Sequence, residues 1–260
     1  MDKESNTDIE LARPKVVVLL TATIDPRNTV KVARNDPWQR LEDYKKAMSK
    51  CWLSENRPID IIFCENSNFN LSELRRLCER NSKSNVRIEF LSFSGQECSS
   101  HLGKGFGEMG IIAHALQHAT VLRRGNPLIL KVSGRLVIGN IGSLLAALQE
   151  MSGTFHISCD LRRNLEWADA RLFIARASFL RDYLVPMQQM IDDSKGLTIE
   201  HILCRATHKA IGDGLKWIPT ICTPQIFGVS GTTGIPYSES SAHWAARDLF
   251  RRMKNWAIAR

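Results

Sequence analysis

Two basic residues, Lys131 and Arg135, flank a short Val-Ser-Gly segment that follows an apolar run. Residues four apart on an extended strand point to the same side, so we expect both cations to lie together at a strand end. Converging Lys and Arg donors hold a diphosphate and stabilise the negative charge that builds on a leaving group. The pair is therefore predicted to bind a diphosphate. The alternative is two surface cations at the end of a strand.

A glycine-rich segment, Gly-Lys-Gly-Phe-Gly-Glu at residues 103–108, opens a predicted helix. Glycines let the backbone approach a ligand, and the N–H groups of a helix N-terminus favour phosphate. The spacing matches neither a P-loop nor the dinucleotide fingerprint. Lys104 is thus a candidate phosphate ligand, and the alternative is a flexible helix start in which Glu108 favours the helix dipole.

Polar clusters follow two predicted strands, at residues 21–27 and 65–67. Ligands of open parallel sheets bind beyond the carboxyl ends of the strands. Thr21 and Thr23 offer hydroxyls there, while Asp25 and Glu65 could accept hydrogen bonds from a ribose or a base. The alternative is ordinary loop capping, for which Asp, Asn and Ser are favoured.

Three carboxylates are candidates for catalysis because each follows or starts a predicted element: Asp160, Asp169 and Glu200. Each could equally be a cap or an ion-pair partner. His114 and His118 are four apart on a helix, which suits a metal, but their neighbours are Ile, Ala and Leu and favour a packed helix face. The seven cysteines show no C-x-x-C spacing and are expected to be reduced and buried.

Alternating strands and helices are predicted to position these side chains. In the first hundred residues, strands at 15–20, 59–64 and 86–93 alternate with helices at 37–53, capped by Asp36, and at 71–82, started by Asn70. This pattern is typical of a parallel βαβ sheet. The remaining predicted elements are helices at 108–122, 141–151, 177–192 and 198–211, strands at 128–132, 156–159 and 172–175, and loops with short strands at 217–237.

The chain is therefore expected to form one α/β domain, a Rossmann-type three-layer sandwich with a mostly parallel central sheet. Residues 1–13 are expected to be disordered, residues 14–239 to form the domain, and residues 240–260 to form a basic amphipathic helix. No apolar run is long enough to span a bilayer and no signal core follows the N-terminus, so a cytoplasmic protein is expected.

The net charge of +8 favours an anionic partner: a nucleotide diphosphate, a nucleic acid or an acidic membrane. A basic α/β nucleic-acid-binding protein is one alternative, but the cations are spread along the chain and no RRM, KH or helix-turn-helix signature is present. Another nucleotide-dependent enzyme is a second alternative. A Rossmann oxidoreductase or methyltransferase would use a glycine fingerprint at the first turn, which is absent.

The ordered set of motifs resembles a family of bacterial glycosyltransferases from O-antigen and capsule gene clusters, over roughly residues 15–237. A K-x-[ST]-G-R-[YF] strand and a late G-x-S-G-[ST]-[ST]-G loop recur in that family. The runs that carry the resemblance are Glu65-Asn66-Ser67, residues 103–108, Leu130 to Arg135, Ala168 to Phe173, Ile199-Glu200-His201 and Gly228 to Gly234. Leu136 departs from the pattern, because the family commonly has an aromatic residue there.

The resemblance implies a GT-A-like fold, a nucleotide-sugar donor, expected to be UDP-linked, and a glycan or lipid-linked oligosaccharide acceptor. It does not imply a nucleic-acid partner. Three groups of residues carry the expected site: Thr21, Thr23, Asp25, Glu65 and Asn66 at the nucleotide, Lys104, Lys131 and Arg135 at the diphosphate, and Asp169, Glu200 and Glu108 as sugar-binding or base carboxylates, with Asp169 the first choice for the base.

Metal dependence is left open. The usual D-x-D of GT-A enzymes is absent and Asp160-Leu161-Arg162 is a poor substitute, so no metal ligand is named, and Mg²⁺ or Mn²⁺ is neither required nor excluded. Without a metal, Lys and Arg would stabilise the leaving diphosphate. The basic C-terminal helix also carries Trp and Phe, which suits the anionic inner face of the cytoplasmic membrane. The alternative is a helix that packs its aromatic side on the domain.

Overall fold

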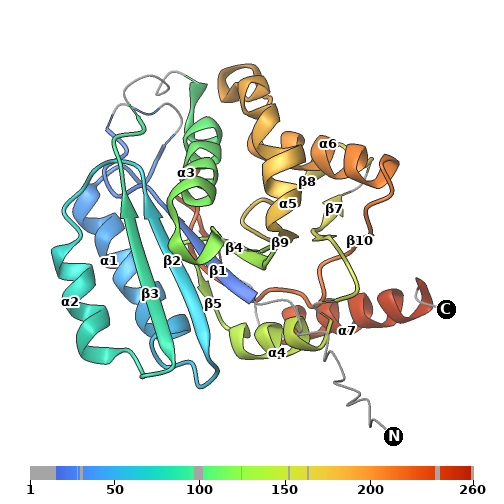
Figure 1. Ribbon diagram of the computed structural model, residues 1–260, viewed down its shortest axis with the longest axis horizontal. Coiled ribbons are helices and arrows are strands. Elements are labelled where there is room, and N and C mark those ends of the chain that lie inside the picture. Colours follow the sequence, from blue (N-terminus) through green and yellow to red (C-terminus); the bar gives the residue numbers. More distant parts are fainter. Residues whose placement is uncertain are drawn as a thin grey trace, which may run out of the picture.

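The computed structural model describes residues 16–258 except 28, 30–31, 97–101, 124, 152, 163 and 238–240, and it shows an α/β fold (Figure 1). The predicted disorder of residues 1–13 lies outside the described residues. A seven-stranded sheet has the order β10-β6-β9-β4-β1-β2-β3. Its strands are β1 (Val16–Ala22), β2 (Ile59–Glu65), β3 (Val86–Ser92), β4 (Leu128–Ser133), β6 (Ile157–Ser158), β9 (Leu172–Arg176) and β10 (Trp217–Ile218).

The sheet is mostly parallel. Strand β1 pairs in parallel with both β2 and β4, so that Leu19 lies between Ile62 and Lys131, whereas β9 runs antiparallel to β4 and β6. The three N-terminal strand predictions and the β4 prediction are confirmed. Strands β1, β2 and β4 are continuous apolar runs because helices cover both of their faces.

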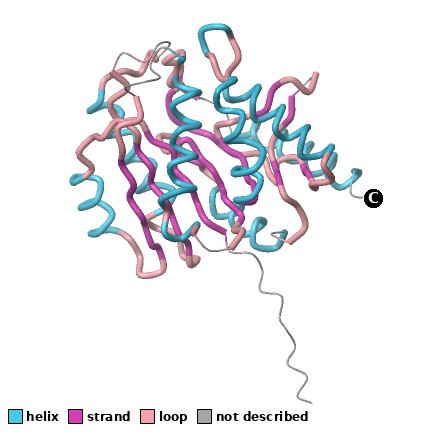
Figure 2. Tube along the Cα trace, turned by 45° about the horizontal axis from the view of Figure 1, so that its top comes forward, coloured by secondary structure: helices cyan, strands magenta, loops and turns pink. Residues whose placement is uncertain are grey.

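Helices form a layer on each face of the sheet, as Figures 1 and 2 show. One face packs against α1 (Pro37–Ala47), its π-helical continuation η1 (Met48–Trp52), α2 (Ser72–Asn81) and α4 (Ile141–Met151). The other packs against α3 (Lys104–His118), α5 (Ala177–Phe179), the π-helix η4 (Leu180–Leu184) and α6 (Ile199–Gly212). The predicted three-layer α/β sandwich with a mostly parallel central sheet is therefore confirmed.

Two helix starts follow the expected side-chain chemistry. Asp36 caps α1 by accepting a hydrogen bond from the Gln39 amide at 2.7 Å, with Pro37 at the first helical position. Thr198 caps α6 in a reciprocal capping box with His201.

Three boundaries differ from the predictions. Helix α3 begins at Lys104 rather than at 108, because Gly103 takes a positive φ of 95° and turns the chain into the helix. Helix α2 has Leu71 as its cap, although Asn70 still accepts from the Ser72 amide. The helix expected at 177–192 divides into α5, η4 and the 3-10 helix η5 (Val185–Met190), whose Pro186 has no N–H to donate.

Short elements complete the chain: β5 (Val137–Ile138), β7 (Leu161–Arg162), β8 (Trp167–Ala168), β11 (Ile226–Val229), β12 (Pro236–Tyr237), η3 (Thr120–Leu122) and η6 (Asp193–Lys195). The predicted C-terminal helix is α7 (Ser241–Ile258). It docks on the loop after β10, where Trp244 donates to the Thr223 carbonyl and Asp248 accepts from the Thr223 amide. No described helix has both the length and the apolar character needed to cross a bilayer.

Candidate active site

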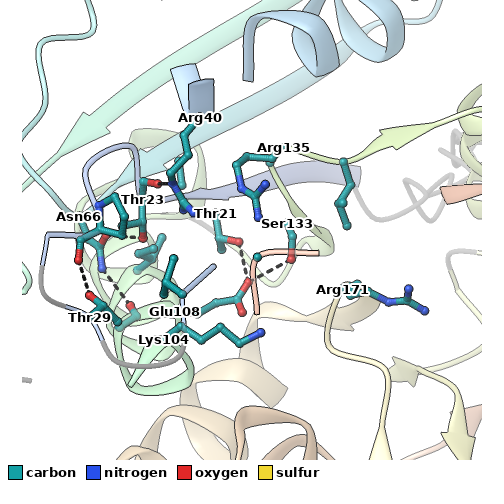
Figure 3. A pocket seen from close by; sticks show the side chains of 18 of the residues that line it. Thr21, Thr23, Thr29, Arg40, Asn66, Lys104, Glu108, Ser133, Arg135 and Arg171 are labelled. Atoms are coloured by element: carbon teal, nitrogen blue, oxygen red, sulfur yellow. Dashed lines mark hydrogen bonds between the residues drawn. The ribbon is translucent and has the colours of Figure 1, made fainter. Parts of the chain in front are cut away.

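A pocket lies at the carboxyl ends of β1, β2 and β4, where an open parallel sheet binds its ligands. It contains about 980 Å³ of empty space, part of which is open to solvent. Thr21, Asn66 and Ser133 come from the strand ends, while the first turn of α3 and the start of α6 form the opposite wall (Figure 3).

One end of the pocket carries hydroxyl and amide groups from Thr23, Thr29 and Asn66, with Arg40 beside Thr23 (Figure 3). The Thr23 hydroxyl donates to Asn66 Oδ1 at 2.7 Å, and Asn66 Nδ2 donates to the Gly107 carbonyl at 3.4 Å. The Thr23 amide is held by the Tyr44 hydroxyl at 2.8 Å. These bonds fix hydroxyl and amide groups on the wall, where they suit a base or a ribose. The expected positions of Thr21, Thr23 and Asn66 at the pocket are thus observed.

Among the described residues, four cations line the pocket: Arg40 at the Thr23 end, and Lys104, Arg135 and Arg171 elsewhere. Figure 3 shows Lys104 next to Glu108 and Arg135 near Thr21, whereas Arg171 lies apart from them with its guanidinium pointing away. Arg135 is held by Asp43 and by the Val229 carbonyl, both at 3.3 Å. Lys104 is exposed in the first turn of α3 and pairs with no carboxylate among the described residues. Lys104 and Arg135 therefore line the pocket, as predicted for diphosphate ligands.

Arg40 is a buried cation that the sequence did not single out. Its guanidinium donates to the carbonyls of Thr23 and Arg34 at 2.7 and 3.0 Å. Burial lowers the pKa of Arg40, since desolvation disfavours the charged form. No carboxylate hydrogen-bonds to it in the described part of the chain, and its side chain lines the pocket.

Lys131 and Arg135 do not lie on the same side, so that part of the prediction is wrong. Strand β4 ends at Ser133, and the turn through Gly134 sends Arg135 to Asp43 on α1, while Lys131 points to Glu108 on α3. Lys131 is fully buried and is not among the residues that line the pocket. Four residues apart share a side only while the strand remains extended.

Glu108 is the centre of a hydrogen-bond network below the pocket. Its Oε1 accepts from the Lys131 ammonium, from Thr21 at 2.8 Å and from Ser133 at 3.3 Å, and Lys131 also donates to the Ala170 carbonyl at 2.6 Å. Burial raises the pKa of Glu108, but the charge and hydrogen bond of Lys131 outweigh it and hold the pKa below its usual value. Glu108 lines the pocket as an ionised, cation-paired carboxylate.

Glu65 and Asp25 lie outside the pocket lining, contrary to their predicted position. Glu65 is fully buried and accepts from the amides of Ile24, Ser67 and Phe69 at 2.8–3.2 Å. The carboxylate of Glu65 therefore accepts hydrogen bonds from the loops after β1 and β2, and it has few lone pairs left to accept a hydrogen bond from a ribose. Asp25 accepts from the Arg27 amide in its own loop at 3.0 Å.

Asp169 is also outside the lining, because two arginines occupy its carboxylate. Arg171 donates from Nε and Nη2 at 2.9 and 2.6 Å, and Arg162 donates at 3.0 Å. Burial raises the pKa of Asp169, but the hydrogen bonds and charge of Arg171 lower it by more, so the pKa lies below its usual value. A general base needs a pKa near the working pH, so this environment does not favour Asp169 as the base.

Glu200 lies in the first turn of α6 and lines the pocket. No described cation pairs with it. It is therefore the lining carboxylate whose oxygens remain available to a ligand hydroxyl.

A divalent cation does not fit the described donor set. Asp160, the substitute for a D-x-D aspartate, pairs with Arg251 at 2.8 Å and with Arg162 at 3.8 Å. Among the described residues, no three His, Cys, Asp or Glu side chains come together as a metal site. His114 stacks on Phe93 with ring centroids 4.0 Å apart. Mg²⁺ and Mn²⁺ prefer several oxygen ligands, and the described residues do not bring several free carboxylate oxygens together.

No family model and no curated protein matches the chain. Solved structures do match. A mannosyltransferase from Pyrobaculum calidifontis in complex with GDP-Man and Mn²⁺ is 14% identical with a TM-score of 0.46, over 80% of this chain and 55% of that chain. The glycosyltransferase GlyE of Streptococcus pneumoniae is 11% identical with a TM-score of 0.48, over 79% and 45%. This chain thus spans about half the length of those two proteins. A cytidylyltransferase from Leptospira borgpetersenii is 12% identical with a TM-score of 0.44, over 94% and 96%.

Proposed function

We propose that the chain is a glycosyltransferase that uses a nucleotide-sugar donor. One observation carries the proposal: one pocket at the strand ends is lined by hydroxyl and amide groups, by cations, and by Glu200, whose carboxylate pairs with no cation among the described residues. A nucleoside suits the hydroxyl and amide groups and a diphosphate suits the cations. An acceptor hydroxyl needs a base, which Glu200 supplies.

In the proposed reaction, the acceptor oxygen forms a bond to the anomeric carbon as the bond from that carbon to the diphosphate breaks. The bonding electrons leave with the nucleoside diphosphate, and the acceptor proton goes to Glu200. Lys104, Arg135 and Arg171 stabilise the charge that builds on the leaving diphosphate, and Arg135 and Arg171 are already held in place before the reaction. Glu108 and Lys131 keep the pocket floor in position. No step is assigned to a metal ion, because the described donors do not form a site for one.

The first experiment is a thermal-shift screen with UDP, GDP, CDP, ADP and dinucleotides, followed by hydrolysis and transfer assays with the matching nucleotide sugars. A ligand of the native state raises the melting temperature. We expect a nucleoside diphosphate to raise it and its sugar to be hydrolysed or transferred. Retention on DNA without any nucleotide effect would favour the nucleic-acid alternative and contradict the proposal.

We further propose a role in bacterial O-antigen or capsule synthesis, on the resemblance of the K-x-S-G-R and G-x-S-G-T-T-G runs, with α7 resting on an anionic membrane. Leu249, Phe250 and Met253 project from α7 with 62, 72 and 61% exposure. Asp248, on the opposite side, binds the domain. An exposed apolar stripe on a basic helix suits an interface between headgroups and acyl chains.

A flotation assay tests the membrane role. Wild-type protein is expected to float with vesicles that contain anionic lipid and not with neutral vesicles. A triple Leu249→Ser, Phe250→Ser, Met253→Ser variant should stay at the bottom and keep transfer to a soluble acceptor. Equal flotation of both proteins would contradict the role of α7 without touching the proposed chemistry.

A further inference from the structure

An alternating row of arginines and aspartates runs from the pocket to the C-terminal helix. Arg171 pairs with Asp169, which pairs with Arg162, which lies near Asp160, which pairs with Arg251 of α7. The N–O distances along this row are 2.6, 3.0, 3.8 and 2.8 Å. Three segments of the chain therefore meet in one charge network, and of its five residues only Arg171 lines the pocket.

Resting on the proposed function, we infer that Asp169 is a positioning residue that acts through Arg171, and that the row carries this positioning out to α7. Asp169 makes a two-point contact with Nε and Nη2 of Arg171 and also accepts from the Arg171 amide at 3.1 Å. Such a fork fixes the plane of the guanidinium as well as its position.

Further contacts close off the remaining freedom of Arg171. Its guanidinium lies 5.0 Å from the centre of the Tyr237 ring, and Tyr237 itself lines the pocket. Lys131 holds the Ala170 carbonyl, one residue before Arg171. Arg171 lines the pocket, and these contacts with Asp169 and Tyr237 fix the guanidinium at the edge of the space where a diphosphate or an acidic acceptor group would bind.

The outer half of the row is more exposed. The side chains of Arg162 and Asp160 are 45 and 27% exposed, against 11% for Asp169. Arg162 is steadied by the Trp167 ring, 4.8 Å away. Exposed pairs contribute less than buried ones, so the effect on Arg171 should weaken with each step toward Arg251.

A double-mutant cycle separates positioning from direct catalysis. We expect Asp169→Asn to lower kcat/KM by about 10- to 100-fold, and Arg171→Gln by at least as much. In the Arg171→Gln background, Asp169→Asn should change kcat/KM less than twofold, because the group through which it acts is gone. Asp169→Glu, which keeps the charge, should recover part of the activity. A further tenfold loss in the double variant, or the disappearance of the acidic limb of the pH–rate profile in Asp169→Asn, would show that Asp169 is the base and overturn the inference.

A second variant removes any dependence on the folding of Asp169→Asn. Arg171→Lys keeps the cation but loses the fork, so it should lose as much kcat/KM as Arg171→Gln. Wild-type kinetics in this variant would overturn the inference. Pyrophosphate binding by calorimetry is a readout that needs no transfer: Asp169→Asn should weaken it only when Arg171 is present. Wild-type protein that binds pyrophosphate but transfers no sugar would refute the proposed function alone, while protein that binds neither would refute both.

The far end of the row is tested with a soluble acceptor, so that membrane binding plays no part. Arg251→Ala is expected to lower kcat/KM about two- to fivefold in wild type and not at all in the Arg171→Gln background. Arg205→Ala, which removes an exposed arginine of α6, is the matched control and should have no effect in either. Equal losses from Arg251→Ala in both backgrounds would overturn the coupling to α7.

Discussion

Replacement of Lys131 by alanine should destabilise the fold as well as affect the reaction. Lys131 is fully buried, and its ammonium donates hydrogen bonds to Glu108 and to the Ala170 carbonyl. Removing one partner of a buried ion pair leaves the other charge uncompensated and costs about 3–5 kcal/mol. Domains of this kind unfold with free energies of about 5–15 kcal/mol, so roughly a fifth or more of the stability would be lost.

The measurement is urea unfolding of wild type, Lys131→Ala and the double variant Lys131→Met, Glu108→Leu. We expect the free energy of unfolding to fall by about 3 kcal/mol or more in Lys131→Ala, because Glu108 then loses the buried cation that hydrogen-bonds to it. The double variant should recover most of that loss, since a packed apolar pair replaces the ionic one. It should remain inactive, because the hydroxyls of Thr21 and Ser133 lose their acceptor.

Two results would refute this reasoning. A Lys131→Ala variant within about 1 kcal/mol of wild type would mean that the ammonium is solvated or that Glu108 is neutral. A double variant as unstable as Lys131→Ala would mean that the site needs the volume and hydrogen bonds of the pair rather than charge balance. A loss of activity in Lys131→Ala would then indicate the loss of a diphosphate ligand, which is the role that the sequence predicted for Lys131.

Three further predictions concern the pocket, and one concerns acid stability. Arg135→Ala should weaken binding of the nucleoside diphosphate about tenfold or more with little effect on the melting temperature, and unchanged affinity in calorimetry would contradict its role. Glu200→Gln should lower the transfer rate about 10²- to 10⁴-fold while nucleotide affinity stays within twofold, and wild-type turnover would exclude it as the base. EDTA should lower transfer less than tenfold, whereas a complete loss restored by Mn²⁺ would assign the leaving charge to a metal. The pKa of Asp169 is lowered in the folded protein, so the stability that it contributes is present above the unfolded pKa of about 3.9 and is lost as the pH falls through the folded pKa. The free energies of unfolding of wild type and Asp169→Asn, measured in urea, should therefore converge on acidification. A constant difference between them from pH 7 to 2.5 would contradict this.

The layers of the fold could be predicted because short sequence patterns determine the strands and helices that form them. Apolar runs such as Val16–Ala22 can be satisfied only between two helix layers, and Asp36-Pro37 specifies a helix start whatever lies around it. The direction of β9 could not be predicted. Its five residues are as apolar as a parallel strand, and the connection from β6 through the β7–β8 hairpin alone makes it antiparallel.

The site was predictable only in part, for a similar reason. Thr21, Thr23 and Asn66 reach the pocket because they sit where strands end, which the sequence shows. Glu65 follows a strand in the same way, but its carboxylate accepts from amides of its own loops, and no pattern separates a residue that builds a loop from one that binds a ligand. Arg40 had no signal at all, because a helix arginine is usually exposed and only the tertiary packing buries it.

The Lys-Val-Ser-Gly-Arg run shows how one short motif serves two jobs. Up to Ser133 the chain is a strand in the middle of the sheet, so Lys131 is forced inward and must have an anionic partner, which Glu108 provides. Gly134 then passes close to the Thr21 carbonyl and the Tyr44 ring, where a Cβ would come within 3.1–3.2 Å of both. A larger residue would push the turn away from β1, and Arg135 would no longer reach Asp43 and the pocket.

We therefore expect Gly134→Ala to reduce nucleotide binding through Arg135 while the Lys131–Glu108 pair stays intact. Loss of binding with an unchanged free energy of unfolding would support this division of the motif, and a parallel loss of both would contradict it.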